Sequence, residues 1–199
     1  MTTETLYELL IEGIIEQGYG VADAFVSPNE LAALRKLLLQ HYADGHFKQA
    51  GIGKGDSHQH QTGIRGDSIL WLEQDSEAIS ELGYMQHIND FISYLNHSCF
   101  TGLNSFELHY AHYPTGTFYK KHTDRFTNDQ SRAYSLIMYL NEDWKEDDGG
   151  ELLLYLDNGQ EHKILPLGGR VVCFPSHVIP HEVLPAKKLR LSLTGWLKK

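Results

Sequence analysis

A histidine and an aspartate stand one residue apart in the stretch HYPTGTFYKKHTDRF, residues 112–126. On an extended strand, residues i and i+2 project from the same face, so His122 and Asp124 would point the same way and Thr123 would point away. One imidazole and one carboxylate can take two adjacent positions around a divalent metal ion. The pattern also suits a solvated, charged strand edge. A third ligand elsewhere in the chain would decide between the two interpretations.

The segment PSHVIPHEVLP, residues 175–185, contains two candidates for that third ligand, His177 and His181. His181 is preferred because it begins an expected strand and lies between two prolines that stiffen its backbone. His177 is expected in a loop. Two histidines and one carboxylate leave one face of a metal ion open, which is the arrangement that suits non-haem Fe(II) oxygenases.

An arginine follows nine residues after His181, on the expected strand LRLSLTGWL, residues 189–197. We expect this strand to pair next to the strand of His181. An arginine that points inward along an apolar strand is costly unless a carboxylate meets it. Because a guanidinium matches a carboxylate bidentately, a dicarboxylate co-substrate would satisfy Arg190.

The N-terminal half of the chain is expected to be helical. Apolar residues recur at helical spacing over residues 4–17 and stop at Gly18. A second helix is expected from Ser27 as N-cap and Pro28 as first residue to about Gly45. A third is expected over residues 76–100, with Gly83 as a candidate break.

The C-terminal half is expected to form short strands. Turn residues separate seven apolar or alternating runs, residues 105–113, 132–140, 150–156, 162–167, 170–175, 181–185 and 189–197. This spacing indicates a double-sheet sandwich or jelly roll, and the lack of strand–helix alternation argues against a doubly wound parallel sheet. The Gly-, Ser- and His-rich stretch 51–63 is expected to be a mobile loop that leads into one more strand at 69–73.

Length and charge narrow the class of protein. The 199 residues fit one domain, residues 1–199, with helical support over about 1–100 and a jelly-roll core over about 101–199. The net charge of -9 argues against a footprint for nucleic-acid phosphates and against binding to anionic membranes. The acidic N-terminal stretch is neither a signal peptide nor a membrane span. With only Cys99 and Cys173 present, a reducing cytoplasm is the default.

Taken together, these residues resemble a known family. H-x-D, a distal histidine and an arginine nine residues later look like the 2-oxoglutarate- and Fe(II)-dependent dioxygenases of the prolyl hydroxylase class. The resemblance spans about residues 20–197: HYPTGTFYKKHTD is similar to the family's Tyr-Pro-Gly segment before H-x-D, and IMYLNEDW followed by GGELLLY is similar to its central strand pair. The stretch IRGDSILWLE resembles the finger-loop strand of the enzymes that act on hypoxia-inducible factor.

The resemblance implies a fold and a role for each matching residue. The fold would be α+β, with a double-stranded β-helix core of the jelly-roll or cupin-like kind and packing helices at the N-terminus, in a bacterial-type member. Iron would be bound by His122, Asp124 and His181. The distal carboxylate of 2-oxoglutarate would be held by Arg190 and Tyr139, in a pocket lined by Tyr113 and Thr194. The substrate would meet Arg65, Asp67, Arg132 and Trp196, with Trp71 as a packing aromatic. The loop 51–63 and a shorter turn between Tyr113 and His122 depart from the family.

The implied reaction uses Fe(II), 2-oxoglutarate and O2, with ascorbate as an auxiliary reductant, and couples decarboxylation to succinate with hydroxylation of a prolyl residue. The expected partner is a protein, a translation or regulatory protein being the first candidate, and neither nucleic acid nor a membrane. We also expect residues 53–67 to close over the site as a lid, with Arg65 and Asp67 as its anchored end.

Four other functions remain open. The chain could be a 2-oxoglutarate-dependent hydroxylase of a free amino acid or other small molecule. It could be a cupin-type metal enzyme without 2-oxoglutarate, which has no need of Arg190. A nucleic-acid demethylase of the same superfamily would use the same chemistry, but the net charge and the finger-loop strand weigh against it. A metal-free binding module is the last alternative.

Overall fold

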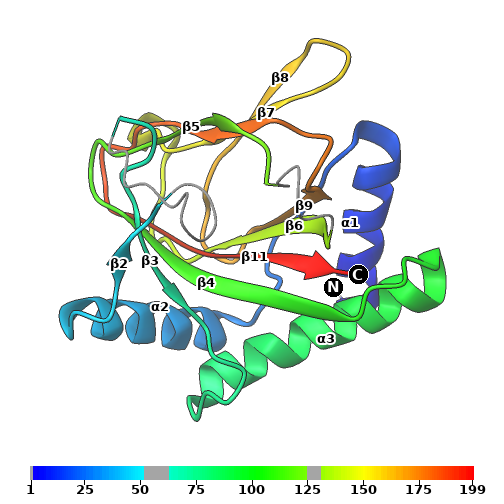
Figure 1. Ribbon diagram of the computed structural model, residues 1–199, viewed down its shortest axis with the longest axis horizontal. Helices are drawn as coiled ribbons and strands as arrows, with labels where there is room; N and C mark the ends of the chain where they lie inside the picture. The colour runs from blue at the N-terminus through cyan, green and yellow to red at the C-terminus, as the bar shows by residue number, and fades with distance from the viewer. Residues whose placement is uncertain (1, 52–62, 125–130) are drawn as a thin grey trace.

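The computed structural model describes residues 2–51, 63–124 and 131–199. Two antiparallel sheets stack face to face, and three helices cover the outer face of the larger sheet (Figure 1). Helices and sheets thus occupy three layers, and the double-sheet core expected from the short strands of the C-terminal half is present. Within the described ranges, no helix combines the length and the apolar character that crossing a bilayer requires.

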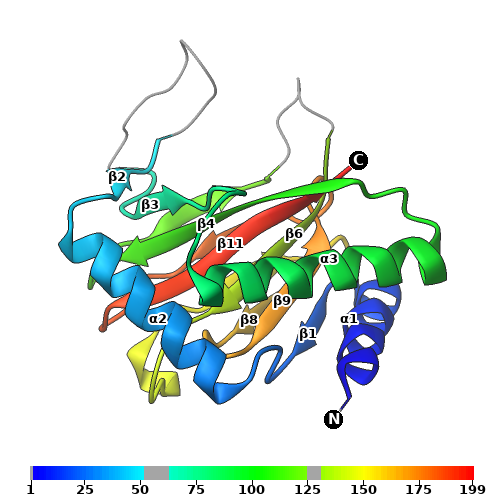
Figure 2. The same ribbon diagram turned by 90° about the horizontal axis from the view of Figure 1, so that it is seen from below.

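The three helices are α1 (Thr3–Gln17), α2 (Pro28–Ala43) and α3 (Ile79–Cys99). Helix α2 begins with the expected cap, because Ser27 and Glu30 form a reciprocal capping box. The candidate break at Gly83 is wrong, since α3 runs through this residue without interruption. Its buried stripe packs on the sheet, and that burial outweighs the roughly 1 kcal/mol that a helical glycine costs. Figure 2 shows the three helices spread across the outer face of the larger sheet.

The larger sheet has seven strands, in the order β1 (Gly20–Ala22), β9 (Val171–Pro175), β6 (Arg132–Tyr139), β11 (Arg190–Lys198), β4 (Ser105–Tyr113), β3 (Ser68–Trp71) and β2 (Lys48–Gln49). The smaller sheet has the order β5 (Tyr119–His122), β10 (His181–Val183), β7 (Leu152–Tyr155) and β8 (Glu161–Ile164). A short 3-10 turn, η2 (Glu146–Asp148), precedes β7. Strands β1 and β2 escaped prediction because two or three residues are too few to show an alternation.

Strand alternation divides the core into two layers. In β4, Leu108 and Tyr110 pack against the helices, whereas Ala111 and Tyr113 lie between the sheets. The same period of two operates in β6 and β11. The inner-face residues of these central strands therefore form one wall of the space between the two sheets.

The expected pairing of the Arg190 strand beside the His181 strand is wrong. Strand β11 pairs with β4 and β6 in the larger sheet, while β10 pairs with β5 and β7 in the smaller one. An alternating apolar pattern identifies a strand but not its neighbour, and the chain after β10 passes to the other sheet before β11 begins. Arg190 and His181 consequently lie on opposite walls.

Residues 64–67, which we call the crossing segment, join the two sheets. The amide of Gly66 donates to the carbonyl of Phe118 (3.0 Å), and the amide of Lys120 donates to the carbonyl of Ile64 (2.8 Å), so the segment extends the free edge of β5. Strand β3 begins one residue later and pairs with β4 of the larger sheet. Gly66 allows this close approach, since an added Cβ would lie 2.8 Å from Cβ of Thr117.

Candidate active site

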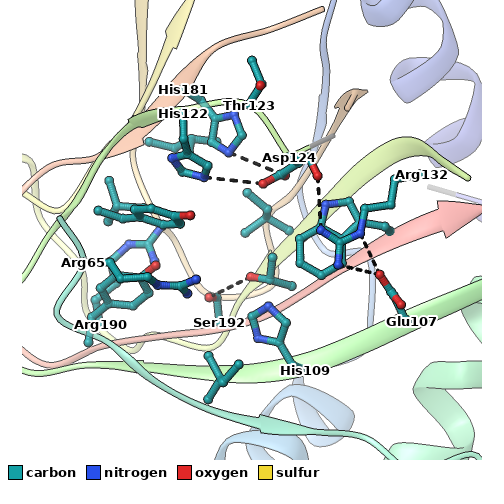
Figure 3. Close-up of a pocket in the computed structure, with 18 of the residues that line it drawn as sticks. Arg65, Glu107, His109, His122, Thr123, Asp124, Arg132, His181, Arg190 and Ser192 are labelled. Atoms are coloured by element: carbon teal, nitrogen blue, oxygen red, sulfur yellow. Dashed lines mark hydrogen bonds and ion pairs between the residues drawn. The ribbon is translucent and has the colours of Figure 1, made fainter. Parts of the chain in front are cut away.

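A cavity of about 460 Å³ opens between the two sheets at one end of the sandwich. One wall is built by inner-face residues of β4, β6 and β11, and the other by β5, β7 and β10 (Figure 3). His122, Asp124 and His181 lie on the smaller-sheet side, and Arg190 lies among the larger-sheet residues. The cavity therefore brings together the four residues whose spacing first indicated metal and carboxylate chemistry.

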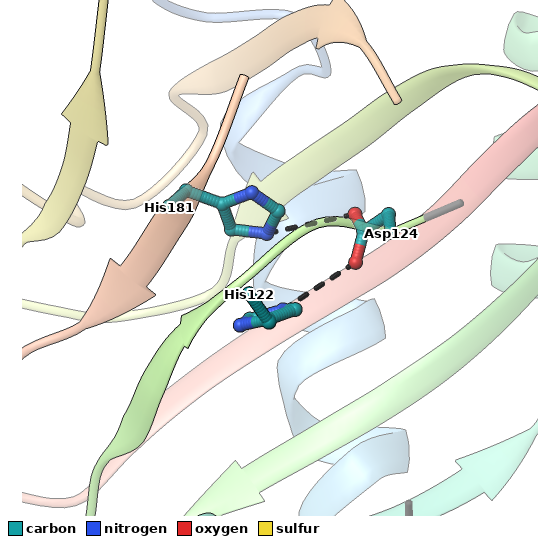
Figure 4. Close-up of side chains that lie close together, drawn as sticks. All are labelled: His122, Asp124 and His181. Carbon is teal, nitrogen blue, oxygen red and sulfur yellow. Dashed lines mark ion pairs between the residues drawn. The ribbon is translucent and has the colours of Figure 1, made fainter. Parts of the chain in front are cut away.

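The three candidate metal ligands converge (Figure 4). His122 is the last residue of β5 and the cross-strand partner of His181, the first residue of β10. Nε2 of His122 lies 3.4 Å from Oδ1 of Asp124, and Nε2 of His181 lies 3.6 Å from Oδ2. Asp124 is not on the strand as expected, because β5 ends at His122. The chain bends after Thr123 and turns the carboxylate toward both rings.

Backbone carbonyls orient the two imidazoles. Nδ1 of His122 lies 2.7 Å from the carbonyl of Lys120, and Nδ1 of His181 lies 3.1 Å from the carbonyl of Ile179. A carbonyl can only accept, so each Nδ1 carries the hydrogen, and the neutral form of each ring presents Nε2 as a lone pair. Both Nε2 atoms face the Asp124 carboxylate.

Burial sets the charge state of the cluster. Burial lowers the pKa of His181 to about 4, which keeps this imidazole neutral near pH 7. Burial alone would raise the pKa of Asp124, but the neighbouring His181 and His122 and the hydroxyl of Ser135 together hold it below its usual range. Ser135 donates to Oδ2 of Asp124 (2.7 Å) and lies 2.9 Å from the hydroxyl of Ser176.

This donor set fits a divalent metal ion. Two imidazole lone pairs and an ionised carboxylate lie within 4.8 Å of one another and face a common point. Three acceptors held together in a partly buried site repel one another unless a cation lies between them. Two nitrogen ligands and one carboxylate match the facial arrangement of non-haem iron sites.

Arg190 and Tyr139 form the other end of the cavity. Arg190 is 1% exposed, and its Nε donates to the carbonyl of Gly150 (2.9 Å). Its Nη2 and the hydroxyl of Tyr139 are buried and have no hydrogen-bond partner among the described residues. Burial raises the pKa of Tyr139, so this hydroxyl stays a donor. Two buried donors without an acceptor fit an anionic ligand.

The remaining predicted co-substrate residues line the same wall. The guanidinium of Arg190 lies 5.1 Å from the ring centroid of Tyr113 and 5.0 Å from that of Tyr139. The hydroxyl of Thr194 lies 3.2 Å from that of Ser192. Trp196 belongs to the same strand and lines the cavity farther from Arg190.

The two arginines expected to contact substrate are both engaged inside the protein. Nε of Arg132 donates to Oε1 of Glu107 (2.7 Å), its Nη1 donates to the carbonyl of Asp124 (3.1 Å), and its Cζ lies 3.5 Å from the ring centroid of Trp196. Arg65 donates twice to Asp67, at 2.8 and 2.6 Å, and the Asp67 side chain is fully buried. Both guanidinium groups thus brace the walls of the cavity.

Sequence reasoning missed three polar residues of the cavity wall, Glu107, His109 and Ser192, and also Ser135, which donates a hydrogen bond to Asp124. Strand alternation in the sequence could have identified these residues. Glu107 and His109 precede Tyr113 by even numbers of residues on β4, Ser135 precedes Tyr139 by four on β6, and Ser192 follows Arg190 by two on β11. Each therefore shares a face with a residue that had already been assigned to the site.

Residues 53–62 of the expected lid lie outside the described residues. Its expected anchors, Arg65 and Asp67, belong to the crossing segment. Trp71 is 42% exposed at the rim, with its ring centroid 5.0 Å from that of His109 and 6.1 Å from that of Trp196. The rim of the cavity is therefore aromatic.

Comparison with known proteins agrees with this geometry. The sequence profile of the 2OG-Fe(II) oxygenase superfamily matches residues 108–198. Human Egl nine homolog 1 is 33% identical over 144 residues, which cover 67% of this chain and 33% of that protein. The chain spans about a third of the length of the curated relatives that it matches.

Two solved structures superpose over nearly the whole chain. A Pseudomonas putida prolyl-4-hydroxylase has a TM-score of 0.87 and 35% identity, with 98% of this chain and 99% of that chain covered. A Trichoplax adhaerens prolyl hydroxylase, in complex with a peptide fragment of the hypoxia-inducible factor oxygen degradation domain, has a TM-score of 0.88 and 27% identity, with 98% and 90% covered.

Fold, site and comparisons place the chain in the 2-oxoglutarate- and Fe(II)-dependent oxygenase superfamily, whose cofactor and co-substrates are Fe(II), 2-oxoglutarate and O2. The predicted α+β class with a jelly-roll core is confirmed. Within this superfamily, the chain belongs to the prolyl hydroxylase group.

Proposed function

We propose that this chain hydroxylates a prolyl residue of a protein at C4, and that O2 and 2-oxoglutarate are consumed and succinate and CO2 are released. The observation that carries the proposal is the complementarity of the two ends of one cavity. Three acceptors without a cation stand at one end, and two buried donors without an anion stand at the other. Fe(II) and a dicarboxylate together would satisfy both.

Each group of residues in the cavity would have a separate role. His122, Asp124 and His181 would hold Fe(II), and Arg190 and Tyr139 would donate to the distal carboxylate of 2-oxoglutarate. When bound, Fe(II) and 2-oxoglutarate supply O2 activation, which places one oxygen atom in succinate and the other in the substrate C–H bond. Tyr113, Thr194 and the apolar side chains Ile137, Leu152 and Val183 would pack around the co-substrate and exclude water from it.

The aromatic rim supports a prolyl substrate. The exposed Trp71 stands at the rim and the buried rings of Trp196 and His109 line the wall next to it, and such rings accommodate the compact, apolar proline ring. His109 remains neutral near pH 7, because burial lowers its pKa to about 4, and it adds no charge to this wall. The two structural relatives described above are themselves prolyl hydroxylases.

A protein partner follows from the same rim and from the relatives. The Trichoplax relative is in complex with a peptide fragment, and the exposed Trp71 offers an aromatic surface on which a peptide would pack here. The net charge of -9 disfavours nucleic acid. A translation or regulatory protein is our first candidate. Two free cysteines, Cys99 and Cys173, fit a reducing compartment such as the cytoplasm, and ascorbate would serve as the auxiliary reductant.

The test is turnover of proline-containing peptides with Fe(II), 2-oxoglutarate, ascorbate and labelled O2, followed by mass spectrometry. We expect one labelled oxygen atom in a prolyl residue and an equal amount of succinate, with neither product from Asp124→Ala. The same peptides with each proline replaced by alanine serve as the substrate control. Labelled oxygen in free proline or another small molecule, with none in any peptide, would replace the protein substrate by a small-molecule one.

A further inference from the structure

A stacked column of side chains connects the crossing segment with the candidate ligand His122. The ring of Tyr119 lies 3.5 Å from the ring of His122, with an interplanar angle of 16°. The guanidinium of Arg65 lies 4.2 Å from the centroid of the same tyrosine ring. Two groups this close to one centroid cannot share a face, so Tyr119 is held between Arg65 and His122.

Both ends of the column are anchored. At one end, Arg65 makes its double hydrogen bond to Asp67, whose side chain is fully buried. At the other end, Nδ1 of His122 donates to the carbonyl of Lys120. The backbones of the two segments are also connected, because Arg65 and Tyr119 are partners in an antiparallel bridge between the crossing segment and β5. The column is therefore a rigid link and not a chance contact between mobile side chains.

The two candidate histidine ligands differ in how much support they receive from packing. The His181 side chain is 4% exposed, and its ring meets that of Phe174 at 4.9 Å in an edge-to-face contact. The His122 side chain is 17% exposed and is the last residue of its strand. Its hydrogen bond to the carbonyl of Lys120 fixes the direction of Nδ1, but the plane of the ring needs a second restraint. Among the described residues, the face of Tyr119 supplies this restraint as a stacked contact, beside a tilted contact with the ring of His181, whose centroid lies 4.3 Å from that of His122.

We infer that Tyr119, backed by the Arg65–Asp67 pair, positions His122 for metal binding. The column is a set of positioning residues that act through the ligand and do not touch the metal. Contacts around metal-binding histidines fix ring orientation, and their loss typically weakens metal affinity by about 10- to 100-fold. This inference rests on the proposed function, since it assumes that His122 is a ligand.

The test measures Mn(II) binding to the metal-free protein by calorimetry and electron paramagnetic resonance, without turnover. Tyr119→Leu removes the ring face and should weaken Mn(II) binding by about 10-fold. Tyr119→Phe retains the stacked ring and should bind Mn(II) like the wild type. Tyr155→Leu is the matched control, because Tyr155 lies in the same sheet under Lys121 (3.4 Å) and away from the ligands. It should also bind Mn(II) like the wild type.

Two further variants change the Arg65–Asp67 pair, at the end of the column away from His122. Arg65→Lys keeps the positive charge beside the buried Asp67 but loses the planar guanidinium, so it should weaken Mn(II) binding by several-fold. This variant keeps the proposal testable if Tyr119→Leu does not fold. The double variant Arg65→Gln/Asp67→Asn removes both charges at once and leaves no unpaired buried carboxylate. It should weaken binding in the same direction.

The outcomes separate the inference from the proposed function. Melting of each metal-free variant shows whether it folds, and the visible spectrum of the Co(II) form should change in Tyr119→Leu because the ligand geometry changes. A folded Tyr119→Leu variant with wild-type Mn(II) affinity overturns the positioning role alone. A wild type that binds no Mn(II) overturns the proposed function and this inference together. Weaker binding in Tyr119→Leu, with Tyr119→Phe and Tyr155→Leu unchanged, supports the positioning role.

Discussion

Single residues define this site through polar atoms that lack suitable partners. Nε2 of His122, Nε2 of His181 and the Asp124 carboxylate are acceptors that face one another, while Nη2 of Arg190 and the hydroxyl of Tyr139 are donors without an acceptor in the described part of the chain. Leaving a buried polar group unpaired costs on the order of 1–3 kcal/mol, and more if it is charged. Where such groups converge on one cavity, a ligand that pairs with them offsets this cost.

Replacement of Arg190 tests the anionic end of the cavity. Arg190→Ala should raise the 2-oxoglutarate concentration needed for half-maximal succinate formation by about 30-fold or more, because losing a buried, charge-assisted contact costs roughly 2–5 kcal/mol. Arg190→Lys should recover only part of this loss, since an ammonium cannot form the bidentate fork. Arg35→Ala, which removes an arginine of α2 paired with the exposed Glu142, is the control and should leave the dependence unchanged. An unchanged dependence in Arg190→Ala would assign the carboxylate to another cation.

The stability of the folded chain depends on pH through His109. Burial and the nearby Arg65 lower its folded-state pKa from the ordinary 6.5 to about 4. The unfolded chain therefore binds more protons than the folded chain between these values, so stability is full above the ordinary pKa and is lost as the pH falls toward the folded-state pKa. The loss amounts to about 3 kcal/mol, from the shift of the pKa.

His109→Met removes this titrating group and should reduce the loss of stability on the acid side while leaving the contribution of His181, measured by urea unfolding between about pH 4 and 8. His177→Gln replaces an exposed histidine and should keep the wild-type profile. If His109→Met and the wild type lose stability equally over this range, the imidazole of His109 is not the group responsible.

Among the elements, the central strands were predictable because each buries two different faces. Strands β4, β6 and β11 alternate between the helix-covered core and the cavity, and their bounds match the predicted runs to within one residue. The N-terminal cap of α2 was equally predictable from the sequence. The bend at Asp124 was not, because a local turn after a strand leaves no periodic trace. Period-two spacing placed His122 and Asp124 on one face of a strand, but only His122 lies on the strand, and Thr123, which was expected to point away, also lines the cavity.

Two glycines test how helices pack on this sheet. An added Cβ at Gly83 of α3 would meet nothing closer than Oε1 of Glu30 at 3.9 Å, so Gly83→Ala should stabilise the protein by about 0.5–1 kcal/mol. At Gly20 of β1, an added Cβ would lie 2.1 Å from the carbonyl oxygen of Leu10 in α1. Gly20→Ala should therefore destabilise the protein by about 1–3 kcal/mol. Urea unfolding of both variants is the measurement, and a destabilised Gly83→Ala variant would contradict this account of α3.

The whole molecule places opposite chemistry on its two sheets. The candidate metal ligands belong to the smaller sheet and the loop after β5, whereas Arg190, Tyr139 and the aromatic rim belong to the larger one. The distance between the candidate metal ligands and Arg190 is thus set by how the two sheets stack. The crossing segment links the two walls, and its Arg65, paired with Asp67, lines the cavity.

This division between sheets was beyond sequence reasoning. The motif residues His122, Asp124, His181 and Arg190 could be named from their types and spacing, and the structure brings them to one cavity. Their distribution over two sheets depends on which strands pair, and pairing is decided by contacts between residues far apart in the chain. The alternating pattern of β11 is equally compatible with either sheet.

The central claim is that this cavity runs Fe(II)- and 2-oxoglutarate-dependent chemistry, and the most direct measurement is succinate formation by the purified chain. The assay supplies O2, ascorbate and 2-oxoglutarate, with and without Fe(II), and it needs no knowledge of the prolyl substrate because such turnover can proceed uncoupled. We predict succinate that requires Fe(II) in the wild type and its loss in a folded Asp124→Ala variant. Equal succinate from Asp124→Ala, or none from the Fe(II)-loaded wild type with or without peptide, would contradict the account.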